Sequence, residues 1–175
     1  KTCAAEADAL LDSLLLETAS PALRVMQSMR YAGLGQGKRL RPFLVVESAA
    51  LFGVPRQQAL RVGAALECVH CYSLVHDDLP AMDDDDLRRG KPTTHKAFDE
   101  ATAILAGDAL LTFAFEILSD AATHPDADIR IRLVSGLSKA AGKAGMVGGQ
   151  MLDIEAESRV TSSLSDISLI QSLKT

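Results

Sequence analysis

The stretch that decides how this chain folds is residues 77–90, which read Asp77-Asp78-Leu79-Pro80-Ala81-Met82-Asp83-Asp84-Asp85-Asp86-Leu87-Arg88-Arg89-Gly90. Six carboxylates fall within ten residues, and two arginines follow. Close carboxylates repel one another, so a folded protein rarely gathers them without a cation between them. Mg²⁺ is commonly held by carboxylates together with substrate phosphates, and arginine forks match phosphate geometry. The stretch therefore predicts a magnesium-bridged phosphate ester, and a solvated acidic loop is the alternative.

The residues before this stretch predict a long helix that ends near Pro80. Apolar side chains recur at helical spacing through residues 56–78, and the residue before a proline resists helical geometry. Asp77 then lies on the last turn of the helix, and Asp83 lies just past the break. Positions six apart would point apart on a continuous helix, so only a bend at Pro80 would bring Asp83 back beside Asp77.

The same helix carries a histidine and two cysteines. His70 lies seven residues before Asp77 and so shares nearly the same face, although a lone histidine there is more often a packed residue than a ligand. Cys68 and Cys71 match C-x-x-C, but a zinc or redox site needs partners that the sequence lacks, so two buried thiols are expected. Three cysteines without a disulfide framework favour a reducing, cytoplasmic compartment.

A basic cluster opens the preceding helix, which is predicted to end near Phe52. It reads Lys38-Arg39-Leu40-Arg41-Pro42. Lys38 and Arg41 are three apart and are expected to share one helix face, whereas Arg39 points elsewhere. Cations at a helix N-terminus, where free N–H groups also point outward, predict an anion site. Ordinary surface basicity is the alternative.

The rest of the chain predicts an all-α protein that forms one domain over residues 1–175. No strand with alternating polarity is apparent, and further helices are expected over about residues 4–18, 21–32 and 98–119, and from 163. Residues 129–157 are expected to form one helix or a pair of helices. Gly107 would let a neighbouring helix approach closely, and Asp108 would need a polar partner in so apolar a helix. Gln150 and Asp153 share one face of a glycine-rich helix, where an exposed polar edge is the alternative.

Composition narrows the function classes. Apolar residues make up 47% of the chain and charged residues 23%, which is typical of a globular protein. The net charge of −5 argues against nucleic acid as a partner. No apolar run reaches the roughly 18 residues expected of a membrane span, so none is expected.

Taken together, these pieces resemble the trans-prenyl diphosphate synthases of the farnesyl diphosphate synthase type. The matching pieces, in the family's order and spacing, are Gly37-Lys38-Arg39-Leu40-Arg41-Pro42, His70, residues 77–90, Gly107-Asp108-Ala109-Leu110, Gly148-Gly149-Gln150 with Asp153, and Lys174-Thr175. The resemblance implies an isoprenoid synthase-type helical bundle around a deep central cavity, usually as a homodimer. It also implies Mg²⁺ as cofactor, with isopentenyl diphosphate and an allylic diphosphate as substrates.

The resemblance further implies a role for each motif residue. The metal-binding carboxylates are Asp77, Asp78 and Asp83. The ligands of isopentenyl diphosphate are Lys38, Arg41, His70 and Arg89. The allylic diphosphate site comprises Arg88, Lys174, Thr175, Gln150 and Asp153. The catalytic residues are Asp77, Asp83, Arg88 and Lys174. Product chain length is set by Tyr72, five positions before Asp77, and by Ser73, with ordinary helix packing as the alternative for Tyr72.

The family's second aspartate-rich motif is expected downstream of Lys174-Thr175. The resemblance therefore implies the N-terminal part of a longer enzyme, not competent by itself. That enzyme would join isopentenyl diphosphate to dimethylallyl or geranyl diphosphate and yield farnesyl diphosphate. The alternatives are a geranylgeranyl diphosphate synthase of the same family, a non-catalytic partner subunit and a class I terpene cyclase. The intact aspartate motif argues against a pure scaffold, and the second cationic cluster argues against a cyclase, which binds one diphosphate.

Overall fold

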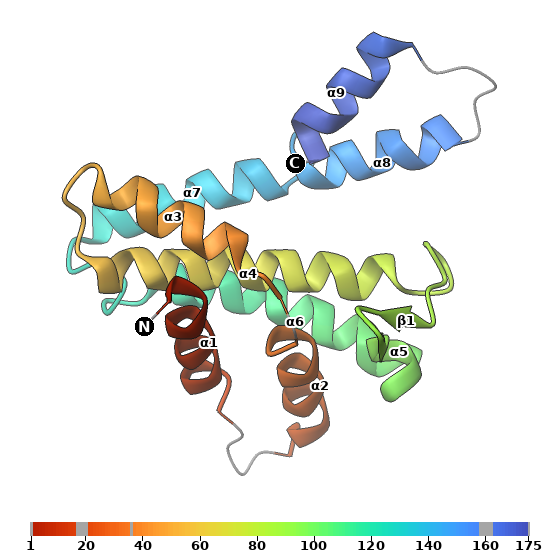
Figure 1. Cartoon of the computed structure of the whole chain (residues 1–175), viewed down its shortest axis with the longest axis horizontal. Helices are drawn as coiled ribbons and strands as arrows, with labels where there is room; N and C mark the ends of the chain where they lie inside the picture. The colour runs from red at the N-terminus through yellow and green to blue at the C-terminus, as the bar shows by residue number, and fades with distance from the viewer. Residues whose placement is uncertain (1, 17–20, 36, 158–162, 175) are drawn as a thin grey trace. The chain divides into compact units, whose positions relative to one another are not determined.

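The computed structural model describes residues 2–16, 21–35, 37–157 and 163–174 of the chain (Figure 1). Helices account for most of these residues, as the sequence predicts. They are α1 (Cys3–Leu14), α2 (Leu23–Gly33), α3 (Leu40–Ala50), α4 (Arg56–Asp77), α5 (Thr94–Ala97), α6 (Glu100–Ser119), α7 (Ala127–Ala141), α8 (Met146–Glu157) and α9 (Leu164–Lys174). Two short strands, β1 (Leu87–Arg88) and β2 (Lys91–Pro92), complete the described elements.

The chain divides into two compact units, Lys1–Ala127 and Asp128–Thr175. The first unit holds α1 to α6 and both strands, and the second holds α8, α9 and nearly all of α7. The single domain over residues 1–175 stays a prediction.

Helix α4 is the centre of the first unit and packs against α6, α3, α1 and α2. Its buried side chains are mostly small and lie on several faces, as expected of a helix covered all round. They include Ala59, Ala64, Ala65, Cys68, Val69, Cys71, Tyr72 and Val75. From α6, Leu110 is fully buried against this core, and truncating such a leucine to alanine typically costs about 2–5 kcal/mol. The burial of Cys68 and Cys71, both free thiols, confirms the expectation of structural cysteines.

Gly107 makes room for the contact between α4 and α6. A Cβ on Gly107 would lie 2.1 Å from Nε2 of His76, so the imidazole occupies the space that a side chain would need. The same Nε2 donates to the carbonyl of Ile104 at 3.1 Å. The predicted close approach is confirmed, but the group that approaches is a histidine ring. Asp108 is 62% exposed, with His76 Nε2 3.9 Å away, so the expectation of an apolar setting was wrong.

The two strands are a feature that periodicity did not predict. Leu87 pairs with Pro92 and Arg88 with Lys91, leaving Arg89 and Gly90 as the turn. Both turn residues have positive φ, 53° and 77°, which is the backbone of a tight type I′ hairpin. Strands of two residues are too short to show an alternating pattern, which explains why they were missed.

Helix α6 is long and apolar enough to satisfy the length and hydropathy criteria for a membrane span, and among the described helices it alone does. In the structure it packs against α4, α2 and α5.

Candidate functional site

The first part of the candidate site is the turn after α4. The N–H of Asp83 donates to the carbonyl of Asp77 at 2.8 Å, and the N–H of Asp84 donates to the carbonyl of Leu79 at 3.2 Å. Pro80 ends the helix, and these bonds fold the chain back. The predicted bend that returns Asp83 to Asp77 is confirmed at the level of the backbone.

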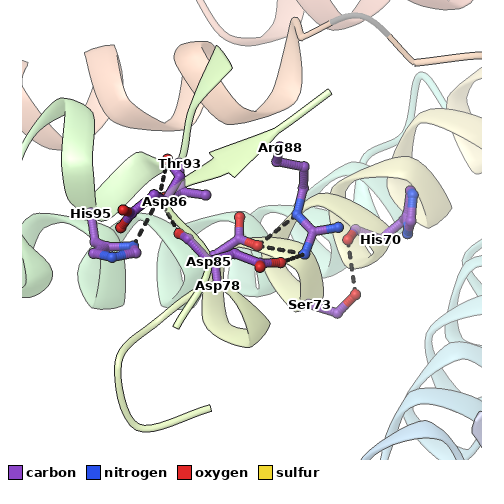
Figure 2. Close-up of polar contacts among 8 residues, drawn as sticks. All are labelled: His70, Ser73, Asp78, Asp85, Asp86, Arg88, Thr93 and His95. Carbon is purple, nitrogen blue, oxygen red and sulfur yellow. Dashed lines mark hydrogen bonds and ion pairs between the residues drawn. The ribbon is translucent and has the colours of Figure 1, made fainter. Parts of the chain in front are cut away.

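The charge at this end of α4 favours a cation. The C-terminus of a helix carries partial negative charge from its free carbonyls, so the carboxylates of Asp77 and Asp78 are repelled there unless a cation is nearby. Asp78 is buried, and its Oδ1 accepts from Nε and Nη2 of Arg88 at 2.6 and 2.5 Å (Figure 2). Arg88 Nη2 also reaches Oδ2 of Asp85 at 3.3 Å. The bond to Asp78 is the main cause that raises the pKa of the Arg88 guanidinium.

The oxygen donors at this turn suit a magnesium ion that is completed by further ligands. No described group of three or more His, Cys, Asp or Glu side chains is arranged to hold a metal by itself. Mg²⁺ needs less, because one or two carboxylates with substrate phosphates and waters complete its shell. Asp77, partly exposed, and Asp83, exposed, have backbones in contact, so this pair fits such an ion. Asp78 differs from the expectation, since its buried carboxylate already pairs with Arg88.

Both arginines of the hairpin line a depression together with Asp78 and His70, but they reach different groups. Arg88 on β1 reaches back to Asp78 at the acidic turn. Arg89, in the turn, lines a basic pocket with Lys38, Arg41 and His70. We call these four residues the basic pocket. The four predicted ligands of isopentenyl diphosphate are therefore brought together.

Lys38 reaches the basic pocket from a backbone position other than the predicted one. Helix α3 begins at Leu40, and Arg39 is its N-cap with a left-handed backbone, φ 51° and ψ 38°. Lys38 thus precedes the helix, and the expectation that it shares a helix face with Arg41 was wrong. The turn at Arg39, not helical periodicity, places the two cations around one pocket.

The wall of the basic pocket includes a buried ion pair that the sequence did not predict. Arg39 Nη1 donates to Glu67 Oε1 at 2.7 Å, and the two side chains are 2% and 3% exposed. Arg39 also donates to Oδ1 of Asp8 and to the carbonyls of Gly33 and Gly35. Glu67 itself is the feature of the sequence that indicates this pair, because a glutamate on a buried helix face needs a cation.

Gly37 separates two guanidiniums at the rim of the basic pocket. A Cβ there would lie 3.0 Å from Nη1 of both Arg39 and Arg89. The lining of this pocket includes four cationic side chains but one carboxylate, that of Glu67, so positive charge is in excess and an anion is the complementary ligand.

His70 contributes a neutral ring to this pocket. Burial is the largest cause that lowers its pKa, to about 4, and the charge of Arg41 adds to the effect. At neutral pH the imidazole is therefore uncharged and can offer one N–H to an anion. Ser73 lies one turn further along and donates its hydroxyl to the His70 carbonyl at 2.9 Å (Figure 2).

Tyr72 lies outside the basic pocket. Its ring is buried and packs edge-on against His76, with centroids 5.7 Å apart. Burial raises the pKa of the Tyr72 hydroxyl. The roles of Tyr72 and Ser73 in chain length stay predictions.

The second unit holds the remaining predicted residues. Lys174 Nζ on α9 donates to Asp153 Oδ2 on α8 at 2.5 Å. Gln150 lies one turn before Asp153 on α8, so the two share a helix face as predicted. Thr175 lies outside the described residues.

The family of this chain follows from comparison with known proteins. The polyprenyl synthetase family model matches residues 23–175. The chain belongs to this family.

Its relatives include bacterial farnesyl diphosphate synthases. The enzyme of Escherichia coli is 51% identical over 160 residues, which are 91% of this chain and 54% of the relative. That of Bacillus subtilis is 54% identical over 134 residues, 76% of this chain and 45% of the relative. The chain thus spans about half the length of these curated relatives.

A solved structure agrees in fold. The apo structure of an FPP/GFPP synthase from Zymomonas mobilis superposes with a TM-score of 0.95 at 53% identity. It covers 99% of this chain and 63% of that chain. The predicted all-α, isoprenoid synthase-type fold is confirmed.

Proposed function

We propose that the protein containing this chain is a prenyltransferase that condenses isopentenyl diphosphate with dimethylallyl or geranyl diphosphate to give farnesyl diphosphate. The single observation that carries the proposal is the hairpin, which gives one arginine to the acidic turn and the other to the basic pocket. Two diphosphate substrates require two separate cationic sites. The family and the names of the farnesyl diphosphate synthase relatives agree with this proposal.

We assign the basic pocket to isopentenyl diphosphate. Lys38, Arg41 and Arg89 supply positive charge and forked donors for the phosphate oxygens, and His70 supplies a neutral donor. We assign Arg88 to the allylic diphosphate, and the roles of Lys174, Thr175, Gln150 and Asp153 toward the same substrate stay predictions.

Mg²⁺ fits the carboxylates Asp77 and Asp83, with Asp78 in support through Arg88. When bound, the ion would neutralise the allylic diphosphate and make it a better leaving group. Arg88 would orient that diphosphate and stabilise the charge that develops on its oxygens.

The proposed bond changes balance without a further reactant. The C1–O bond of the allylic diphosphate breaks, and its electron pair leaves with pyrophosphate. The double bond of isopentenyl diphosphate then forms the new carbon–carbon bond at C1. A proton is lost to the departed pyrophosphate, and the chain is longer by one five-carbon unit.

The deciding experiment is a product assay on the full-length protein. We expect isoprenoid diphosphates of fifteen carbons from isopentenyl and geranyl diphosphates, and no turnover once EDTA removes Mg²⁺. Asp83→Asn should lower kcat by at least about a hundredfold, as loss of a key electrostatic group does, whereas Asp108→Asn on α6 should not. No turnover at all, or cyclised hydrocarbons, would reject the proposal.

The geranylgeranyl alternative is tested by the same assay, because its product has twenty carbons. The comparisons do not favour it over a farnesyl product. A non-catalytic partner subunit would show no turnover with any pair of these substrates.

The assignment of the two diphosphates is tested by kinetics. Lys38→Ala should raise the KM for isopentenyl diphosphate more than that for the allylic substrate, and Lys139→Ala on α7 is the matched control. The reverse ranking would overturn the assignment.

We further propose that the protein works in the cytoplasm as a homodimer and binds neither nucleic acid nor a bilayer. The net charge of −5 and the free cysteines support this proposal. Sedimentation of the full-length protein at several concentrations tests the dimer, and flotation with anionic vesicles tests membrane binding.

A further inference from the structure

Thr93 follows β2 and closes the base of the hairpin. The residue is buried, with 2% of its surface exposed. Its hydroxyl donates to the carbonyl of Asp85 at 2.8 Å and lies 3.4 Å from that of Asp86. Its N–H donates to the carbonyl of Asp86 at 3.0 Å. The residue after β2 is thus tied to the two residues that precede β1.

His95 completes this closure. Its Nδ1 lies 3.1 Å from Oγ1 of Thr93 (Figure 2). The hydroxyl has one proton, and the shorter contact assigns it to Asp85, so Nδ1 of His95 is the donor in the second contact. The ring then carries its proton on Nδ1.

The other nitrogen of His95 supports this assignment. Nε2 is buried and has no hydrogen-bond partner among the described residues. A proton there would be a buried donor without an acceptor, which is less favourable than a bare lone pair. The histidine therefore serves to hold Thr93.

The carbonyls that Thr93 grips belong to residues whose carboxylates are also engaged. Asp85 Oδ2 accepts from Arg88, and Asp86 Oδ1 accepts from Lys96 Nζ at 2.8 Å. Fixing the backbone of these two aspartates fixes the start of β1. Arg88 and Arg89 come directly after this point in the chain. The position of the first residue of β1 therefore decides whether Arg88 reaches Asp78 and whether Arg89 reaches the basic pocket.

We propose that Thr93 and His95 form a clamp that positions Arg88 and Arg89 for their diphosphates. This inference rests on the proposed function for the identity of the ligands, but the clamp itself is tested with inorganic pyrophosphate. Neither residue is proposed to touch a substrate, so both are positioning residues.

The experiment measures pyrophosphate affinity by calorimetry in the full-length protein, alongside the KM for each diphosphate. Thr93→Val keeps the shape and removes the hydroxyl, and we expect affinity to fall by about tenfold, the scale of lost hydrogen bonds. Thr93→Ser should restore affinity to within about threefold of wild type. Hydrogen exchange at the Thr93 N–H should become faster in Thr93→Val.

Thr123→Val is the matched control. The Thr123 hydroxyl is also buried and also donates to a carbonyl, that of Ile117, but Thr123 lies in the turn that follows α6. It should lower thermal stability without changing pyrophosphate affinity. This separates a positioning role from a merely structural one.

Substitutions of His95 provide an independent test if Thr93→Val does not fold. Asparagine presents a donor near the place of Nδ1, whereas leucine presents none. We expect His95→Asn to retain affinity and His95→Leu to lose it by about tenfold. Equal affinity in both histidine variants, or wild-type affinity in Thr93→Val, would overturn the clamp. A wild-type protein that binds pyrophosphate but yields no prenyl product would reject the proposed function and leave the clamp measurable.

Discussion

Arg39 and Glu67 form a buried ion pair, Nη1 to Oε1 at 2.7 Å, in the wall of the basic pocket. The pair joins the left-handed turn before α3 to the middle of α4. Arg39 donates in addition to Asp8, whose side chain is 52% exposed. One arginine therefore has a buried and an exposed carboxylate partner, which makes a direct comparison possible.

We predict that Glu67→Gln destabilises the protein by about 3–5 kcal/mol, because it leaves the Arg39 charge buried without its buried carboxylate partner. Asp8→Asn should cost about 1 kcal/mol or less, because solvent already screens that pair. Urea denaturation of both variants gives the two values. Similar costs for the two variants would contradict the importance of burial. Replacing both Arg39 and Glu67 with apolar residues should recover part of the loss.

We predict that His70 titrates near pH 4 in the folded protein without bound anion. An unfolded histidine takes up its proton at a higher pH, about 6.5. Between these values the unfolded chain binds the extra proton, so the free energy of unfolding falls as the pH drops from about 6.5 to about 4. NMR titration of the ring gives the midpoint.

His70→Asn should remove this part of the pH dependence. Addition of pyrophosphate should raise the midpoint, because a bound anion stabilises the imidazolium. A midpoint near 6.5 in the absence of anion would show that the ring is solvated.

We predict that Gly107→Ala destabilises the protein, although alanine is the better helix former by about 1 kcal/mol. The new Cβ would stand 2.1 Å from Nε2 of His76 and would displace the ring from the carbonyl of Ile104. Overpacking of this kind typically costs about 1–3 kcal/mol. Thermal unfolding measures the net effect.

Two variants check the cause of that loss. In a His76→Ala background the same Gly107→Ala change should become stabilising. Gly136→Ala on α7, where nothing lies within 4 Å of the new Cβ, should stabilise by about 0.5–1 kcal/mol. If Gly107→Ala stabilises the wild-type protein, the contact with His76 is not tight.

We predict that Tyr72→Ala lengthens the product beyond fifteen carbons, provided that the proposed function holds. The ring is large, and it fills space between α4 and its neighbours that a longer tail would need. Chromatography of dephosphorylated products measures the shift, and Tyr72→Phe is the control that keeps the ring. A fifteen-carbon product from Tyr72→Ala would assign Tyr72 to packing against His76 alone.

The sequence by itself determined the helices, the break at Pro80 and the candidate ligands. Helical periodicity and proline geometry act locally, so they predict a helix over residues 56–78 that ends near Pro80, and the structure ends α4 at Asp77 and turns the chain there. Motif order along the chain was sufficient to indicate the family.

Only the tertiary structure decided how the cations are arranged. Arg39, expected to point away from Lys38 and Arg41, is buried, because its αL backbone turns it toward Glu67 on another helix. Likewise, Asp78 pairs with Arg88 only because a two-residue turn folds the hairpin back over α4. Both facts depend on contacts between residues distant in sequence, and local propensity carries no information about such contacts.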